Sequence, residues 1–370
     1  MRYKLDPNRN HEPAYLQLYY LLKQDIIAGI YPFQSKLPSK RTLAIETGTS
    51  VITVEHTYAM LCDEGYVESR ERSGYFVIFH IEDGFLSTSP QNSISIPHFS
   101  QDESHKSNMD FPFSVLTKTM RKVISHYDEY ILNKSPNAGC LELRKVLKHY
   151  LYTSRDISTD IEQIIIGAGA EYLYSLLIPL LGRDKIYGIE TPSYQQIEQV
   201  YQSSQVSYAK LPLGIDGIDS SHLWNSNANI LHITPYRSFP SNITATASKR
   251  FEYLHWAKER NGIIIEDDFE SEFSISKKTE DTLFSLSSDE NVIYLNTFSK
   301  TISPSLRVGY MVLPKSLVPI FEEKLGFYSC TVPTYIQLVL AELISNGDFE
   351  RHINRVRRQK RKECVEKSSK

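Results

Sequence analysis

One lysine of this chain stands among residues that could carry out covalent chemistry. Lys300 follows Ser299 in the stretch LNTFSKT, and Arg307 comes shortly downstream. Asp267 ends an apolar run further upstream. A lysine amine can form a Schiff base with an aldehyde, a carboxylate can pair with a pyridine nitrogen, and arginine and hydroxyl groups can take a phosphate. These residue types predict a pyridoxal 5'-phosphate site in which Lys300 forms the Schiff base and Asp267 pairs with the ring nitrogen.

A glycine-rich turn supplies a second candidate phosphate contact. The stretch GAGAE at residues 167–171 follows a predicted strand and opens a predicted helix. Free backbone amides at a helix N-terminus bind phosphate, and small residues let the ligand approach closely. We therefore expect Ala170 and Glu171 to belong to the cofactor site, on the condition that Glu171 points away from the phosphate.

Tyr194 ends the segment ETPSY, which closes another predicted strand. Its ring is predicted to stack on the pyridine ring, and packing into the protein core is the alternative. Lys300 taken alone is an ordinary loop lysine, Asp267 alone is a helix cap or a solvated residue, and a glycine-rich turn alone is a tight connection. The cofactor interpretation depends on finding all of them in one chain.

The elements that must position these residues are apolar strands that alternate with helices. Strands are predicted at residues 163–166, 185–189, 230–233, 262–266, 292–295 and 309–313, with helices notably at 171–181 and 247–260. Continuous Ile, Val and Leu strands with crossover helices predict an α/β unit whose mainly parallel sheet is covered on both faces. Ligands collect at the carboxyl ends of such strands, and Asp267 and Lys300 both follow one.

The N-terminal part of the chain has a different pattern. Helices are predicted at residues 13–30, 40–46 and 51–64, followed by two short β runs at 66–69 and 75–79. Three helices and a β-hairpin are typical of a winged helix-turn-helix, whose third helix enters the major groove of double-stranded DNA.

Basic and hydroxyl side chains of this part are the candidate DNA contacts, and a solvated surface position is the alternative for each. Residues 1–80 hold nine Lys or Arg and nine Asp or Glu, so their zero net charge weakens the electrostatic argument for nucleic acid. Phosphate contacts are predicted for Lys36, Lys40, Arg41, Arg70 and Arg72, and groove contacts for Thr49, Ser50 and Thr53.

Length and composition bound the remaining possibilities. The chain has 370 residues, 41% of them hydrophobic and 23% charged, which fits two or three soluble domains. We expect a winged helix-turn-helix at 1–80, a Ser-, Pro- and Asn-rich linker at 81–108 and the α/β unit at 109–370. No segment resembles a membrane span or a signal peptide, so a cytoplasmic protein is predicted. The cysteines and histidines lack metal-ligand spacing, which predicts free thiols and no metal site.

Two parts of the chain resemble known families. Residues 12–79 resemble the GntR-type winged helix-turn-helix, above all in the stretches LPSKRTLA and EGYVESR. Residues 109–360 resemble fold type I aminotransferases. Together with IIIEDDFESEF at 263–273 and TFSKTISPSLR at 297–307, nearly the whole chain is similar to the MocR subfamily of bacterial regulators, which fuse these two domains.

The resemblance implies a head-to-tail homodimer in the cytoplasm that binds operator DNA. It also implies that the aminotransferase-like domain serves as an effector sensor for pyridoxal phosphate, alone or with a small amine or amino acid.

The chain departs from the family pattern at several positions. Phe269 stands where the family usually has a tyrosine that donates to the cofactor's phenolic oxygen, which should weaken binding without removing the covalent link. Gln196 and Val51 each replace a common arginine, and the stretch PYRS at 235–238 replaces Pro-Ser-His-Gln. The chain stops at Lys370, so we expect the small C-terminal subdomain of fold type I enzymes, with its substrate-carboxylate arginine, to be absent.

The sequence therefore favours a pyridoxal phosphate-responsive transcriptional regulator in which no residue is predicted to be catalytic. An aminotransferase with an appended DNA-binding domain is the first alternative. The lack of an evident carboxylate clamp argues against it, because transamination needs a firmly held substrate in a closed site. A DNA-binding protein that has lost its cofactor is the second alternative.

Overall fold

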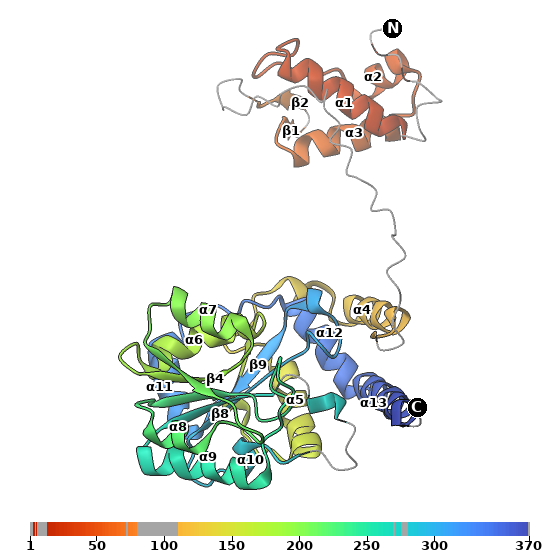
Figure 1. Ribbon diagram of the computed structural model, residues 1–370. Coiled ribbons are helices and arrows are strands. Elements are labelled where there is room, and N and C mark those ends of the chain that lie inside the picture. The colour runs from red at the N-terminus through yellow and green to blue at the C-terminus, as the bar shows by residue number, and fades with distance from the viewer. Residues whose placement is uncertain are drawn as a thin grey trace. The chain divides into compact units, whose positions relative to one another are not determined.

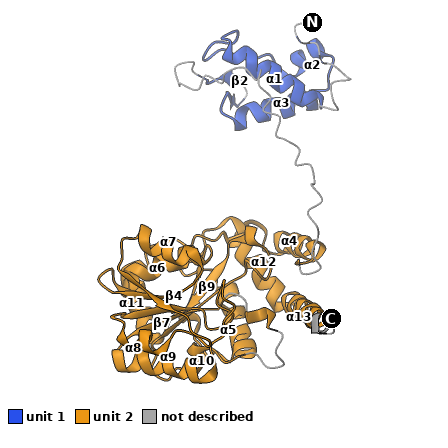
Figure 2. Ribbon diagram, viewed as in Figure 1, with its two compact units in different colours: residues 1–102 blue, residues 103–370 orange. Residues whose placement is uncertain are grey.

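The chain divides into two compact units, residues 1–102 and 103–370 (Figure 2). The structure is a computed structural model, and it describes residues 3, 5, 13–71, 73–79, 110–268, 271–274 and 280–368. The predicted linker at 81–108 lies outside the described residues. Among the helices that are described, none is both long enough and apolar enough to cross a membrane.

The first unit contains three helices and a β-hairpin, as predicted. They are α1 (Ala14–Ile27), α2 (Lys40–Thr47), α3 (Val51–Asp63), β1 (Val67–Arg70) and β2 (Gly74–Val77). The two strands pair antiparallel. Leu18, Leu22 and Ile26 recur every four residues along α1, so they share one helix face, and all three are buried in the core of the unit.

Side-chain caps fix where α2 and α3 begin. Oγ of Ser39 accepts a hydrogen bond from the amide of Thr42 at 3.1 Å, and Oγ of Ser50 accepts one from the amide of Thr53 at 3.1 Å. Each hydroxyl satisfies an amide that the first turn of a helix leaves without a partner. The two helices of the helix-turn-helix therefore start at the residues that the sequence indicated.

The second unit is an α/β fold on one seven-stranded sheet (Figure 1). Its strands are β3 (Ile164–Gly167), β4 (Tyr187–Thr191), β5 (Tyr208–Pro212), β6 (Ile230–Ile233), β7 (Ile263–Asp267), β8 (Val292–Thr297) and β9 (Gly309–Val312). Its α-helices are α4 (Phe113–Tyr127), α5 (Leu141–Arg155), α6 (Ala170–Leu181), α7 (Gln195–Ser203), α8 (Ser220–Asn225), α9 (Ala247–Arg260), α10 (Leu283–Leu286), α11 (Val318–Leu325), α12 (Thr334–Ser345) and α13 (Asp348–Ser368).

The strand order is β3-β9-β8-β7-β6-β4-β5. The neighbours from β5 to β8 pair parallel, whereas β9 is antiparallel to both β8 and β3. The mainly parallel sheet predicted from the sequence is confirmed. The strand β5 was missed, because its sequence YAKLP carries an exposed lysine, which an edge strand tolerates and a central strand does not.

Helices cover both faces of the sheet (Figure 1), which explains why most residues of its central strands are apolar. In β3, Ile164 and Ile166 belong to the core that includes residues of α5 and α12, whereas Ile165 belongs to the core that includes residues of α6 and α11. Successive side chains of a strand point to opposite faces, so a strand covered on both sides favours apolar residues, and its few polar side chains need buried partners.

The strand β7 begins at a close contact. A Cβ atom built on Gly262, the residue before β7, would lie 2.8 Å from Cζ3 of Trp256 and 3.0 Å from the carbonyl oxygen of Asn229. Only glycine fits there without displacing the α9 indole ring or the neighbouring main chain. This contact fixes the start of the strand that ends at Asp267.

Candidate functional site

A cavity of about 310 Å³ opens where strands of the second unit end. Asp267 is the last residue of β7 and Thr297 is the last residue of β8. The cavity is lined by Ala170, Glu171, Tyr174, Tyr194, Phe239, Asp267, Thr297, Ser299, Lys300, Pro304 and Arg307. All seven residues that the sequence predicted as cofactor contacts are among them, although the role of each stays a prediction. Tyr174 and Phe239, which the sequence analysis did not name, line the cavity as well.

Asp267 is buried, with 4% of its surface exposed, and partners from neighbouring elements orient its carboxyl group. Tyr174 of α6 donates its hydroxyl to Oδ2 of Asp267, and Nε2 of His232 in β6 lies 3.8 Å from the same oxygen. On its other side, Nδ1 of His232 lies 2.7 Å from the hydroxyl of Tyr201. Burial and the charge of Asp267 raise the pKa of Tyr174, so its hydroxyl keeps the proton that it donates.

Lys300 and Ser299 lie in the turn after β8, between two anchored side chains. Phe298 and Ile302 are buried in the core that α12 and α13 share. The amide of Ile302 donates to the carbonyl of Phe298 at 2.9 Å, and the amide of Phe298 donates to the carbonyl of Val308 at 2.8 Å. Since both sides of the turn are held, the residues between them line the cavity.

Arg307 stands just before β9 and has a left-handed backbone with φ of 50°. Its guanidinium lies against Gly169, the residue that precedes α6, where a built Cβ atom would be 3.3 Å from Nη2. Gly169 itself has φ of +89°, so both its conformation and the space around it favour glycine. Arg307 and the N-terminus of α6 together form a cationic end of the cavity.

Glu171 does not have the orientation that the sequence analysis required. It lies in the first turn of α6, and its Oε2 accepts a hydrogen bond from Nη2 of Arg307 at 2.9 Å. A phosphate role for the α6 N-terminus was predicted on the condition that this carboxylate points away, and in the structure the carboxylate is paired with Arg307 instead. The physical reason is that both the arginine and the positive end of the α6 dipole attract a negative group.

Tyr194 immediately precedes α7 and is partly buried at the cavity. Its ring centre lies 6.4 Å from that of Phe239, in an edge-to-face arrangement. Burial, together with the nearby Glu171 carboxylate, raises the pKa of Tyr194. The two rings give the cavity an aromatic side. Phe269, the departure from the family tyrosine, lies outside the described residues.

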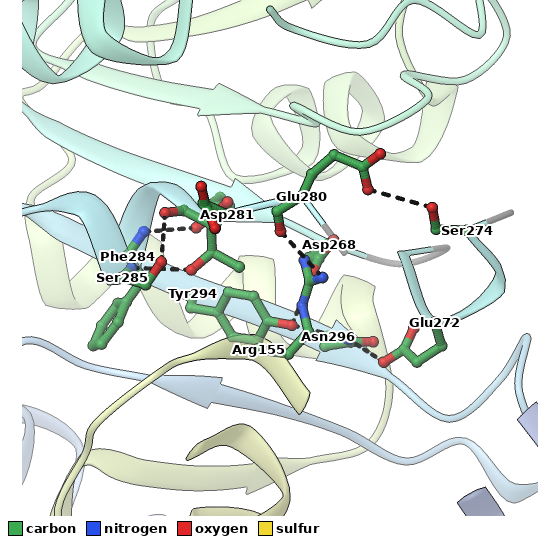
Figure 3. Close-up of polar contacts among 12 residues, drawn as sticks. Arg155, Asp268, Glu272, Ser274, Glu280, Asp281, Phe284, Ser285, Tyr294 and Asn296 are labelled. Atoms are coloured by element: carbon green, nitrogen blue, oxygen red, sulfur yellow. Dashed lines mark hydrogen bonds and ion pairs between the residues drawn. The ribbon is translucent and has the colours of Figure 1, made fainter. Parts of the chain in front are cut away.

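A buried polar network begins at Asp268, the residue after Asp267 (Figure 3). Oδ2 of Asp268 pairs with Nη2 of Arg155 from α5 at 2.5 Å and accepts the hydroxyl of Tyr294 at 2.6 Å. Adjacent residues point to opposite sides, so Asp267 contacts α6 while Asp268 contacts α5. This pair was not predicted, because Arg155 and Asp268 are 113 positions apart and no sequence pattern links the arginine to the acidic stretch.

Two glutamates complete the network. The carboxylate of Glu266 accepts the amides of Leu283 at 2.8 Å and Phe284 at 2.9 Å, and Glu272 accepts a hydrogen bond from Asn296 at 2.6 Å. Burial raises the pKa of Glu266 and of Glu272 to about 7. The network connects the chain on both sides of Asp267 to β8 and α10.

The departure at residues 235–238 forms a separate contact. Ser238, which stands where the family reads Gln, donates its hydroxyl to Oε2 of Glu190 at 2.6 Å, and both side chains are buried. Burial raises the pKa of Glu190 to about 7. Glu190 lies in β4, one residue before the end of the strand.

The basic candidates for DNA contact in the first unit differ in their surroundings. Lys40 pairs with Glu55 of α3 at 2.5 Å, and Arg70 pairs with Glu68 at 2.5 Å. Lys36 and Arg41 are exposed. Arg72 lies outside the described residues.

Thr49, Ser50 and Thr53 lie at the start of α3, as predicted. Their hydroxyls take part in contacts within the protein, since Oγ of Ser50 is 2.9 Å from Oγ1 of Thr53 and Oγ1 of Thr49 is 2.8 Å from that of a neighbouring threonine. Beside them, Ile52 is 65% exposed. Aliphatic side chains in the major groove contact the methyl group of thymine, so Ile52 is a further candidate that the sequence analysis missed.

Two family models match the chain, one for each unit. Residues 14–77 match the bacterial regulatory proteins of the gntR family, and residues 106–367 match aminotransferase class I and II. Kynurenine aminotransferase from Pyrococcus horikoshii has the same fold as the second unit, with a TM-score of 0.61 and 24% identity over 67% of this chain and 64% of the enzyme. The two matches thus define a protein with a gntR-type DNA-binding unit and an aminotransferase-like domain.

Relatives that contain both units are similar along nearly the whole chain. HTH-type transcriptional regulator YdeL of Bacillus subtilis is 34% identical over 357 residues, which covers 95% of this chain and 77% of YdeL. MocR of Rhizobium meliloti, a probable rhizopine catabolism regulatory protein, is 26% identical over 94% of this chain and 74% of its own. The pyridoxine biosynthesis regulator PdxR of Corynebacterium glutamicum is 26% identical over 94% and 77%. The chain belongs to the MocR-type regulators of the gntR family.

Proposed function

We propose that the second unit binds pyridoxal 5'-phosphate through Lys300 and that this binding changes the affinity of the first unit for operator DNA. The observation that carries the proposal is that seven residues from separate parts of the chain line one cavity of about 310 Å³. They come from α6, β7 and the turn after β8, and from the residues just before α7 and β9. Unrelated surface residues are not expected to converge in this way.

The groups in the cavity fit this ligand. Lys300 offers an amine, Asp267 offers a buried carboxyl group, and Tyr194 offers an aromatic face. Arg307 and the amides at the start of α6 make an end suited to phosphate, which Gly169 keeps accessible by having no side chain. Pyridoxal phosphate, when bound, supplies an aldehyde and an electron-withdrawing ring.

Each residue has one task in this proposal. Lys300 holds the ligand covalently through its amine. Asp267, which Tyr174 orients, pairs with the ring nitrogen and favours its protonated form. The phosphate is held by Ser299, by Arg307 and by the amides around Ala170, and Tyr194 stacks on the ring.

The DNA side of the proposal rests on the gntR-type unit. Winged helix-turn-helix proteins of this kind bind paired half-sites, so we propose that two copies of this chain act as a dimer on a double-stranded operator in the cytoplasm. PdxR is named for pyridoxine biosynthesis, which supports a ligand of the same chemical group. A small amine or amino acid that reaches the bound aldehyde would be a second effector at the same cavity.

Covalent trapping tests the proposal. Purified protein is mixed with pyridoxal phosphate, its visible absorption is recorded, and the complex is reduced with borohydride and mapped by mass spectrometry. We expect a visible band and a pyridoxyl group on Lys300, and we expect Lys300→Ala to lose both. Lys118→Ala is the matched control, since Lys118 is exposed on α4 and does not line the cavity.

Other outcomes would redirect the proposal. A pyridoxyl group on a different lysine, or no visible band, would contradict binding through Lys300. Turnover of an amino acid with a keto acid would select the aminotransferase alternative instead.

A further inference from the structure

A carboxylate occupies the end of the cavity that the proposed phosphate needs. Oε2 of Glu171 lies 2.9 Å from Nη2 of Arg307, and the two side chains are 31% and 56% exposed. Both residues line the cavity. The pair therefore faces the ligand space and is also accessible to water.

The backbones of both partners are held by their surroundings. Arg307 has a left-handed backbone just before β9, and its guanidinium rests against Gly169. The backbone of Glu171 is fixed by the first turn of α6, and its side chain reaches Arg307 through rotatable bonds. The pair can therefore separate by rotation of either side chain while both backbones stay in place.

A phosphate group and the Glu171 carboxylate cannot both hold Arg307 at low cost. A phosphate monoester carries between one and two negative charges near neutral pH, and like charges a few ångströms apart repel each other, most strongly away from bulk water. Binding of a phosphorylated ligand must therefore either displace Glu171 from Arg307 or accept this repulsion. An unphosphorylated aldehyde can reach Lys300 while the pair stays intact.

We propose that Glu171 competes with the phosphate of the ligand for Arg307, and that it thereby sets how strongly the cavity prefers phosphorylated over unphosphorylated aldehydes. This inference rests on the proposed function, because it concerns the same cavity and the same ligand class. With glutamate present, part of the attraction between the phosphate and Arg307 is offset by the loss of the ion pair. The cavity therefore prefers the phosphorylated aldehyde less strongly than it would if only Arg307 and the α6 amides acted on the phosphate.

Paired titrations test this inference. Dissociation constants for pyridoxal phosphate and for pyridoxal are measured from the visible band of the wild type and of Glu171→Gln. Glu162→Gln is the matched control, because Glu162 is an exposed glutamate outside the cavity and its substitution removes the same charge. We expect Glu171→Gln to bind pyridoxal phosphate about fivefold more tightly or better, as loss of one competing ion pair and its repulsion permits. We expect the affinity for pyridoxal to stay within about twofold, and the control to match the wild type.

A second variant separates competition from a general charge effect. In Arg307→Gln the ion pair is gone and only direct repulsion between Glu171 and the phosphate remains, so adding Glu171→Gln should change the ratio of the two dissociation constants less than it does in the wild-type background. A ratio that Glu171→Gln leaves unchanged in the wild-type background, or changes equally in the Arg307→Gln background, would overturn the inference while the band at Lys300 leaves the proposed function standing. No covalent adduct with either aldehyde in any variant would overturn both.

Discussion

At the residue scale, the cavity depends on a few side chains that are oriented by neighbouring residues. The carboxyl group of Asp267 has the Tyr174 hydroxyl as donor, and His232 separates it from Tyr201. None of these three supporting residues was predicted, because a Tyr or His in an apolar stretch is most simply assigned to packing. Their importance becomes visible only when β6, β7 and α6 are placed side by side.

Glu190 should make the stability of the second unit depend on pH. Its pKa is raised from 4.5 to about 7, so the folded state holds a proton that the unfolded state releases between these values. The contribution of Glu190 to the free energy of unfolding is therefore largest below pH 4.5. It decreases by up to about 3 kcal/mol as the pH rises from 4.5 to above 7. Urea unfolding of wild type and Glu190→Gln at pH 5 and pH 8 should show the variant gaining stability relative to wild type at the higher pH. A difference independent of pH would contradict this.

At the element scale, the sequence was informative where patterns are local. Helix caps such as Ser39 and Ser50 and the apolar strands β6, β7 and β8 were placed to within a few residues. The carboxyl ends of these parallel strands gather at one edge, so the positions of Asp267 and Lys300 followed from the topology. The contact between Arg307 and Glu171 could not be predicted, because it joins residues 136 positions apart whose charges alone allow many other pairings.

The buried pair between Arg155 and Asp268 should contribute strongly to the cohesion of α5 with the sheet. Asp268→Asn would leave the arginine buried without its charge partner, which typically costs about 3–5 kcal/mol. Chemical unfolding of the variant should show a loss of this size. Asp289→Asn, which affects the exposed pair with Lys258, is the control and should cost less than about 1 kcal/mol. Equal losses in the two variants would mean that burial of the pair is not what matters.

At the scale of the whole molecule, two compact units must communicate if ligand binding is to affect transcription. The basic and acidic residues of segment 1–80 balance, so tight binding to an operator is expected to depend on pairing of two copies more than on charge. The ligand cavity and its seven predicted contacts lie wholly within the second unit. Any effect of the ligand on DNA is therefore a coupling between distinct sites.

This coupling gives a direct prediction. Saturating pyridoxal phosphate should change the dissociation constant for operator DNA by about fivefold or more, in either direction, as typical coupling energies imply. Lys300→Ala should bind the same DNA with the affinity of the ligand-free wild type and should not respond to the ligand. Fluorescence anisotropy with labelled operator measures both. A variant that still responds would show that the ligand acts elsewhere.

The close contact at Gly262 has a consequence for how β7 finds its place in the sheet. The strand and its extension read Ile-Ile-Ile and then Glu-Asp-Asp, so sliding it by one position would leave an isoleucine or an acid at almost every site. The side chains of such a uniform strand do little to specify its register in the sheet. Gly262 specifies the register, because no other residue of the strand fits between the Trp256 ring and the Asn229 carbonyl. A residue at the opposite end of the strand thereby determines which of two adjacent aspartates lines the cavity.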